Sequence, residues 1–142
     1  MVDCYDDEYF VGLWGHKNTQ QHICVRSRIL FVVTFDNCPL LWVSKIQTWI
    51  ALSTIHSEYV VLSNSVRALL PLKSITKEVI DNLVIDSEKL KFLSISTVYD
   101  ENNGSIVLSL STRTTLTSKH IAIKYHWFRE NIGKEFVIQN IE

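Results

Sequence analysis

Strand-like patterns fill the first third of the chain, and the hydrophobic spacing then becomes helical. The run over 4–14 mixes aromatic and acidic residues, the run over 23–35 is rich in β-branched and aromatic residues, and the run over 40–45 is short enough for a third strand. Polar or turn-forming residues separate the three runs. Because the connections between these runs are short, the three predicted strands favour an antiparallel meander.

A long helix is predicted from Thr54 onward, where apolar residues recur at intervals of three and four. This apolar stripe consists of Ile55, Tyr59, Leu62, Val66 and Leu69. Thr54 itself is a suitable N-cap. Pro71 is expected to bend or end the helix, and Ile75, Val79 and Ile80 can continue it as a second segment.

The last third of the chain alternates between strands and short helices. A strand is predicted over 91–99, a short helix over 103–111, a further helix over 119–131, and a glycine turn with a final strand over 133–142. The further helix has one shared apolar face, made of Ile121, Tyr125, Phe128 and Ile132. The order β-β-β-α-β-α-α-β predicts an α/β fold in which helices cover a mixed sheet.

Composition narrows the class of protein. The chain has 142 residues, 46% of them hydrophobic, so we expect a single domain over 1–142 with a sizeable core. The net charge is −1, and nucleic-acid binding would therefore need a local basic patch. No apolar run is long enough to cross a bilayer, so no membrane partner is expected. Cys4, Cys24 and Cys38 lack paired short spacings, which is typical of reduced core thiols in a cytoplasmic or nuclear protein.

Acidic residues lie within or near the ends of several predicted strands and helices. Asp7 lies in the first strand, Glu58 near the start of the long helix, and Asp100 and Glu101 at the end of the fourth strand. Strand and helix ends that meet over a sheet are where α/β proteins place their sites. Converging carboxylates repel one another unless a cation lies between them, and their hard oxygens suit Mg²⁺. The alternative is that these acids are solvated surface groups.

A zinc site and a nucleophilic site are weaker candidates. His16, His22 and Cys24 lie close together, but they lack the paired spacings of zinc sites and fall in a predicted hairpin loop. Cys–His or Ser–His catalysis lacks a recognisable base and orienting acid.

Basic residues around the helices are either phosphate contacts or ordinary solvated surface. The predicted nucleic-acid contacts are Lys119, His120 and Lys124, and the wider basic set adds Lys45 and Arg129. His126 is instead predicted to pack against a helix.

Four stretches together resemble one known family. They are CYDDEYFVG at 4–12, STIHSEYVVL at 53–62, VYDENNG at 98–104 and SKHIAIKYH at 118–126. In order and spacing they resemble the ribonuclease H region of copia-type retrotransposon Pol polyproteins, and the resemblance covers nearly all of the chain.

The resemblance implies the ribonuclease H fold, which is a five-stranded mixed sheet with an antiparallel meander, parallel strands and flanking helices. It implies Mg²⁺-dependent cleavage of the RNA strand of an RNA–DNA hybrid during reverse transcription. Asp7, Glu58 and Glu101 then hold the metal and carry catalysis. The implied partners are the hybrid and the reverse transcriptase and integrase regions of a parent polyprotein.

Several residues depart from the family pattern. Asp6 replaces an apolar residue, Glu8 replaces an alanine and Tyr9 replaces an acid. Charged residues at strand positions that are expected to be apolar threaten the packing of the core face. Glu101 stands where the family has a shorter Asp, and Asp100 is expected to point to the opposite face. The chain stops before the family's C-terminal helix, which carries a further acid. We therefore expect a degenerate domain with weak or lost catalysis, or a non-catalytic nucleic-acid-binding module.

Overall fold

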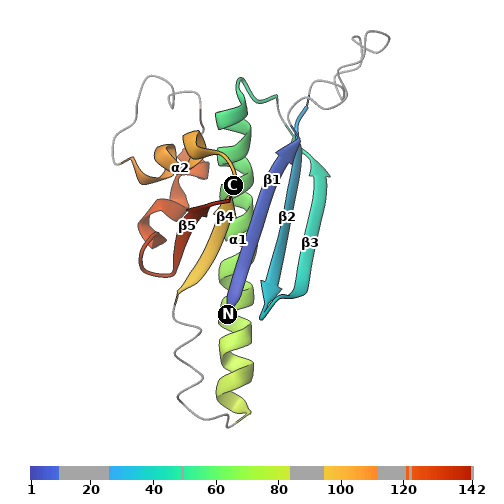
Figure 1. The fold of residues 1–142 in the computed structure, drawn as a ribbon, viewed down its shortest axis with the longest axis vertical. Coiled ribbons are helices and arrows are strands. Elements are labelled where there is room, and N and C mark those ends of the chain that lie inside the picture. Colours follow the sequence, from blue (N-terminus) through green and yellow to red (C-terminus); the bar gives the residue numbers. More distant parts are fainter. Residues whose placement is uncertain (10–25, 49, 84–94, 112–120, 122, 142) are drawn as a thin grey trace.

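A computed structural model describes residues 1–9, 26–48, 50–83, 95–111, 121 and 123–141. The strands are β1 (Val2–Tyr9), β2 (Arg28–Phe35), β3 (Cys38–Ile46), β4 (Ser96–Asp100) and β5 (Phe136–Asn140). The helices are α1 (Thr54–Asn82), α2 (Asn103–Leu110) and two short 3₁₀ helices, η4 (Ile123–Tyr125) and η5 (Trp127–Asn131). Figure 1 shows α1 running along one face of the sheet.

The five strands form one mixed sheet in the order β3-β2-β1-β4-β5. β1, β2 and β3 pair antiparallel, whereas β4 pairs parallel with both β1 and β5. Asp36 and Asn37 join β2 to β3 with positive φ angles of 50° and 64°, as a two-residue hairpin requires. The predicted meander and mixed sheet are confirmed.

The core lies between α1 and the sheet. Alternate side chains of β1 face it, so Val2 and Cys4 are buried whereas Tyr5 is exposed on the other face. There Tyr5 stacks on Tyr99 of β4 with 4.6 Å between ring centroids. Cys38 is exposed, so the prediction of a core thiol holds for Cys4 and is wrong for Cys38.

Helix α1 is longer and starts earlier than the sequence pattern predicts. Ser53, not Thr54, is the N-cap, because its hydroxyl accepts a hydrogen bond from the His56 N–H at 3.2 Å. Pro71 lies inside the helix, which continues to Asn82. Pro71 is exposed, Leu69 before it is fully buried, and Lys73 beyond it forms an ion pair of 2.9 Å with Glu135, so tertiary contacts hold the helix on both sides of the proline. None of the helices in the described part of the chain combines the length and apolarity that spanning a membrane requires.

The further helix predicted over 119–131 is not an α-helix in its described part. Two 3₁₀ helices, η4 and η5, stand there, and bonds from the His126 N–H to Ile123 and from the Arg129 N–H to His126 close their turns. Ile121, Tyr125 and Phe128 of the predicted apolar face are nevertheless buried and Ile132 is partly buried, because a spacing of three to four residues suits both helix types. Gly133, at φ 79°, then turns the chain into β5.

Replacing Leu69 with alanine tests the packing of α1. Leu69 is fully buried, so we expect Leu69→Ala to lower the free energy of unfolding by about 2–5 kcal/mol. Leu110→Ala removes the same atoms from a side chain that is 58% exposed and should cost no more than about 0.5 kcal/mol. Urea denaturation measures both variants, and equal losses would contradict this description of the core.

Candidate metal centre

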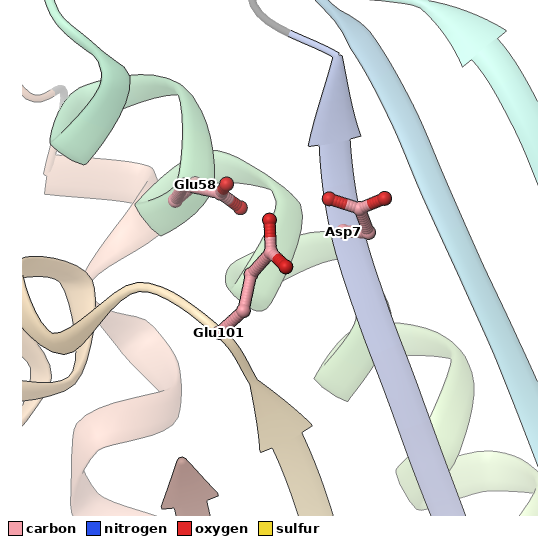
Figure 2. A group of neighbouring side chains, drawn as sticks. All are labelled: Asp7, Glu58 and Glu101. Atoms are coloured by element: carbon pink, nitrogen blue, oxygen red, sulfur yellow. The ribbon is translucent and has the colours of Figure 1, made fainter. Parts of the chain in front are cut away.

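Asp7, Glu58 and Glu101 converge at the C-terminal ends of the central strands β1 and β4. We call this end of the sheet the acidic edge. One carboxylate oxygen from each lies within 4.8 Å of the others. Figure 2 shows the three side chains reaching toward a common point from β1, from the first turns of α1 and from the residue after β4. The sequence-predicted acidic set is therefore brought together by the fold.

Strand register places two of these acids side by side. β1 and β4 run parallel, and Tyr5 pairs with Tyr99. Asp7 and Glu101 each follow their paired tyrosine by two residues, so they leave the sheet at the same level and on the same side. The third acid comes from α1, whose N-terminal turns pack at this edge and carry Glu58.

The three carboxylates differ in exposure and in charge environment. Glu58 is only 5% exposed, and burial, followed by the charges of Asp100 and its acidic neighbours, raises its pKa to about 9. Glu101 is exposed, and its pKa is raised mainly by the negative charge of Asp7. Within the described ranges, no cationic side chain forms an ion pair with any of the three. The three carboxyl groups therefore lie together without a neighbouring cation, and Glu58 keeps its proton at neutral pH.

A divalent cation fits this arrangement. Carboxylate oxygens are hard ligands of the kind that Mg²⁺ prefers, and two of the three groups are open to solvent. A cation bound between them would favour the ionised form of Glu58, whose pKa is raised by burial first and by neighbouring acids second, and of Glu101, whose pKa is raised mainly by Asp7. Asp7, Glu58 and Glu101 are the residues that would hold it.

Asp100 supports the local backbone and does not join the acidic set. It is 1% exposed, accepts a hydrogen bond from the Asn102 N–H at 2.7 Å, and accepts another from the Ser105 hydroxyl. The Asn102 side chain caps α2 by accepting bonds from the Gly104 and Ser105 N–H groups. Asp100 is thus buried whereas Glu101 is exposed, and after burial itself the charge of Asp100 is the main cause that raises the pKa of Glu58.

Asp6 places a carboxyl group in the core face, as its sequence position suggested. It is 5% exposed and accepts a hydrogen bond of 2.6 Å from the Ser65 hydroxyl. Its second oxygen, Oδ1, has no hydrogen-bond partner among the described residues. Burial and the nearby Asp100 raise the pKa of Asp6 well above its usual range.

Glu8 is a fourth acid at the edge of the centre that sequence reasoning did not assign to it. Its Oε2 accepts a bond of 2.6 Å from the Ser57 hydroxyl, and the buried Gln47 donates from Nε2 to the same hydroxyl at 3.0 Å. The charge of Glu8 also raises the pKa of Glu58. The available signal was the pair of serines, Ser57 and Ser65, that face two strand acids from α1.

The basic residues considered as nucleic-acid contacts differ in their exposure and in their contacts within the protein. Lys124 is exposed, and its ammonium group lies 4.8 Å from the ring centroid of Tyr125. Arg129 is a structural residue, because its guanidinium donates to the Tyr59 hydroxyl at 2.8 Å and to the Leu108 carbonyl at 2.7 Å. His126 is bonded to the same Tyr59 hydroxyl through Nδ1, which confirms its packing role. The other candidates, Lys119, His120, His16, His22 and Cys24, lie outside the described residues.

Comparison with known proteins relates the chain to a retrotransposon polyprotein by sequence and to a solved nuclease structure by fold. Over 105 residues the chain is 28% identical to the retrovirus-related Pol polyprotein from transposon TNT 1-94 of Nicotiana tabacum. The aligned part is 74% of this chain but only 7% of that polyprotein. No family model matches the chain.

The structural neighbour is LC11-RNase H1, whose crystal structure was solved in complex with an RNA/DNA hybrid. The TM-score is 0.52 at 14% sequence identity, over 99% of this chain and 85% of the other. This similarity confirms the predicted ribonuclease H fold.

Substitution of Asp6 tests the cost of its burial. Because the pKa of Asp6 is raised in the folded state, the unfolded chain ionises first as the pH rises above about 4, and stability falls. We expect Asp6→Asn to match the wild type near pH 4 and to become progressively more stable than it toward pH 8. Chemical denaturation across this range, in chelator, measures the difference. Asp81→Asn, which alters an exposed acid, is the control. The prediction would be contradicted if the free energy of unfolding of Asp6→Asn fell relative to that of the wild type as the pH rises.

Addition of Mg²⁺ tests the metal centre. A cation that binds only the folded state raises the melting temperature, and at pH 7 it must displace the proton held by Glu58, whose pKa is about 9. The rise in melting temperature should therefore be larger at pH 9 than at pH 7. Glu58→Gln should abolish the response, and Glu78→Gln, which alters an exposed acid of α1, should retain it. An unchanged response in Glu58→Gln would place the cation elsewhere.

Proposed function

Because the chain is a ribonuclease H-like domain related to retrotransposon Pol polyproteins, we propose that it binds RNA–DNA hybrids and holds Mg²⁺ at the acidic edge of its sheet. The observation that carries the proposal is the convergence of Asp7, Glu58 and Glu101 within 4.8 Å. The structural neighbour, which has the same fold, was crystallised with an RNA/DNA hybrid, and this supports the choice of ligand.

The proposed source is a copia-type element. The order and spacing of the four quoted stretches support this assignment, and so does the identity to a retrotransposon Pol polyprotein. The chain spans about 7% of that polyprotein's length, so most of the relative has no counterpart here. Reverse transcriptase and integrase regions are the proposed covalent neighbours in a longer product.

The protein's own residues would position the hybrid and the cation. Bound Mg²⁺ supplies positive charge to the phosphodiester and lowers the pKa of water. Asp7 and Glu101 present exposed carboxylates at the sheet edge, where a nucleic-acid backbone can approach. Glu58 reaches them from a buried position, and the packing of α1 fixes its carboxylate.

We further propose that hydrolysis is weak. Glu101 is one methylene longer than the aspartate of the family pattern, and a displacement of about 1 Å can cost roughly 10²-fold in rate. Burial, followed by the neighbouring acids Asp100, Glu8 and Asp6, raises the pKa of Glu58, so the ionised ligand set is harder to form. The alternative is a binding module without hydrolysis, which the same Glu101 exchange favours.

Cleavage of a labelled hybrid tests the proposal. With Mg²⁺ we expect slow cleavage of the RNA strand by the wild type and loss of at least about 10²-fold in Glu58→Gln. Glu101→Asp should raise the rate, up to about 10²-fold, because it restores the shorter side chain. Glu78→Gln is the matched control and should leave the rate unchanged.

The outcomes separate the alternatives. Rapid wild-type cleavage that Glu101→Asp does not improve would contradict weakened hydrolysis. Binding without cleavage, in both the wild type and Glu101→Asp, would establish the binding module. Failure of the wild type to bind the hybrid at low salt would overturn the proposed function.

A further inference from the structure

Strand β3 ends the sheet on one side, and part of it is unprotected against pairing with a further strand. In the order β3-β2-β1-β4-β5, no strand of the described part of the chain pairs with the outer side of β3 (Figure 1). Pro39, which has no N–H, and a register shift between Val33 and Thr34 interrupt the first part of β3. From Leu41 to Ile46 the only charged residue is Lys45, and an edge strand with so little charge can accept another strand.

One hydrogen bond shows which backbone groups of β3 face outward. The Gln47 N–H donates to the Ser27 carbonyl at 2.8 Å, so the backbone groups of Gln47 point toward the chain of β2. Because this direction alternates along an antiparallel strand, Trp42, Ser44 and Ile46 point their N–H and C=O groups away from β2. These three residues therefore offer a donor and an acceptor each to a strand beside them.

The side chains of the same three residues lie on the face of the sheet opposite α1. Leu41 and Val43 pack against the core, so alternation places Trp42, Ser44 and Ile46 on the other face. Trp42 is 71% exposed and Ile46 is 36% exposed. The Ser44 hydroxyl lies between them and accepts a hydrogen bond of 3.0 Å from Arg28. We call residues 42–46 the β3 strip, which is apolar at both ends and polar at its centre.

We propose that a second copy of the chain pairs with the β3 strip, antiparallel and about a two-fold axis at Ser44. Opposite residues of an antiparallel pair lie on the same face of the sheet. In this register Ser44 lies opposite Ser44 of the second copy, and each Trp42 lies opposite Ile46 of the other chain. Pro39 and the irregular part of β3 stay outside the ladder. The result is one continuous sheet of two copies, and the inference is independent of the proposed function.

The pattern of the β3 strip favours a second copy over an unrelated strand. A two-fold contact requires a surface that is complementary to itself, and the order apolar, polar, apolar about Ser44 meets this requirement. Lys45 lies on the α1 side, where it lines a pocket with Arg67, and in this register it faces Val43 of the second copy. Five residues from each chain cannot bury the roughly 1,200–2,000 Å² of a stable complex, so we expect a weak dimer with a Kd of about 10–500 µM.

Dependence on protein concentration tests the pairing. In sedimentation equilibrium between about 5 and 500 µM, the average mass should rise from that of one chain toward that of two. Trp42→Lys places a charge in the β3 strip and should weaken association at least about tenfold. Val107→Lys makes the same change on α2 at a side chain that is 69% exposed, and it should associate like the wild type. Melting curves check that each variant folds.

A disulfide across the axis tests the register. In a chain that carries Cys24→Ser and Cys38→Ser, Ser44→Cys should give a disulfide-linked dimer under mild oxidation, because its Cα atoms lie about 5.5 Å apart in the proposed pair. Lys45→Cys is the control from the same exposed strand. Its Cα atoms lie about 8 Å apart in this register, so it should crosslink at least about fivefold more slowly.

Three results would overturn the proposed pairing. They are a monomer at every concentration, association that Trp42→Lys leaves unchanged, and equal crosslinking of the Ser44→Cys and Lys45→Cys chains. Binding and cleavage of the hybrid do not require this contact, so each of these results leaves the proposed function standing.

Discussion

The parallel pairing of β1 with β4 is the constraint on which the rest of the structure depends. With Tyr5 opposite Tyr99, Asp7 and Glu101 leave the sheet together, and a shift of one residue would send one carboxylate to the opposite face. The pairing needs a long crossover, which α1 provides, and the first turns of that helix carry Glu58 to the same edge. One choice of register therefore assembles three acids from distant parts of the sequence.

The acidic edge holds further carboxyl groups beside the three proposed ligands. Glu8 and Asp6 lie next to Asp7 in the chain, and both accept hydrogen bonds from serines of α1. These bonds offset part of the cost of burial, yet the pKa of both acids remains raised. A pocket lined by Lys45, Arg67 and Lys124 lies on another side of the same helix. Helix α1 thus lies between an acidic region and a basic pocket.

Much of this arrangement could be predicted from the sequence, because hydrophobic period and turn residues report local structure directly. The meander, α1 and the acids Asp7, Glu58 and Glu101 follow from such patterns and from family resemblance. Continuation of α1 through Pro71 could not be predicted, since it depends on tertiary contacts such as Lys73 with Glu135. The 3₁₀ form of η5 and the Gln47 bond to Ser57 likewise depend on neighbours remote in sequence.

The central claim is that three carboxylates form one cation site. Paramagnetic broadening of NMR signals by substoichiometric Mn²⁺, which takes the same oxygen ligands as Mg²⁺, locates such a site directly. The account predicts that signals of Asp7, Glu58 and Glu101 broaden first, together with those of residues beside them. Broadening that begins instead at exposed acids of α1 such as Glu78 and Asp81, or that spreads evenly over the acidic surface, would contradict it.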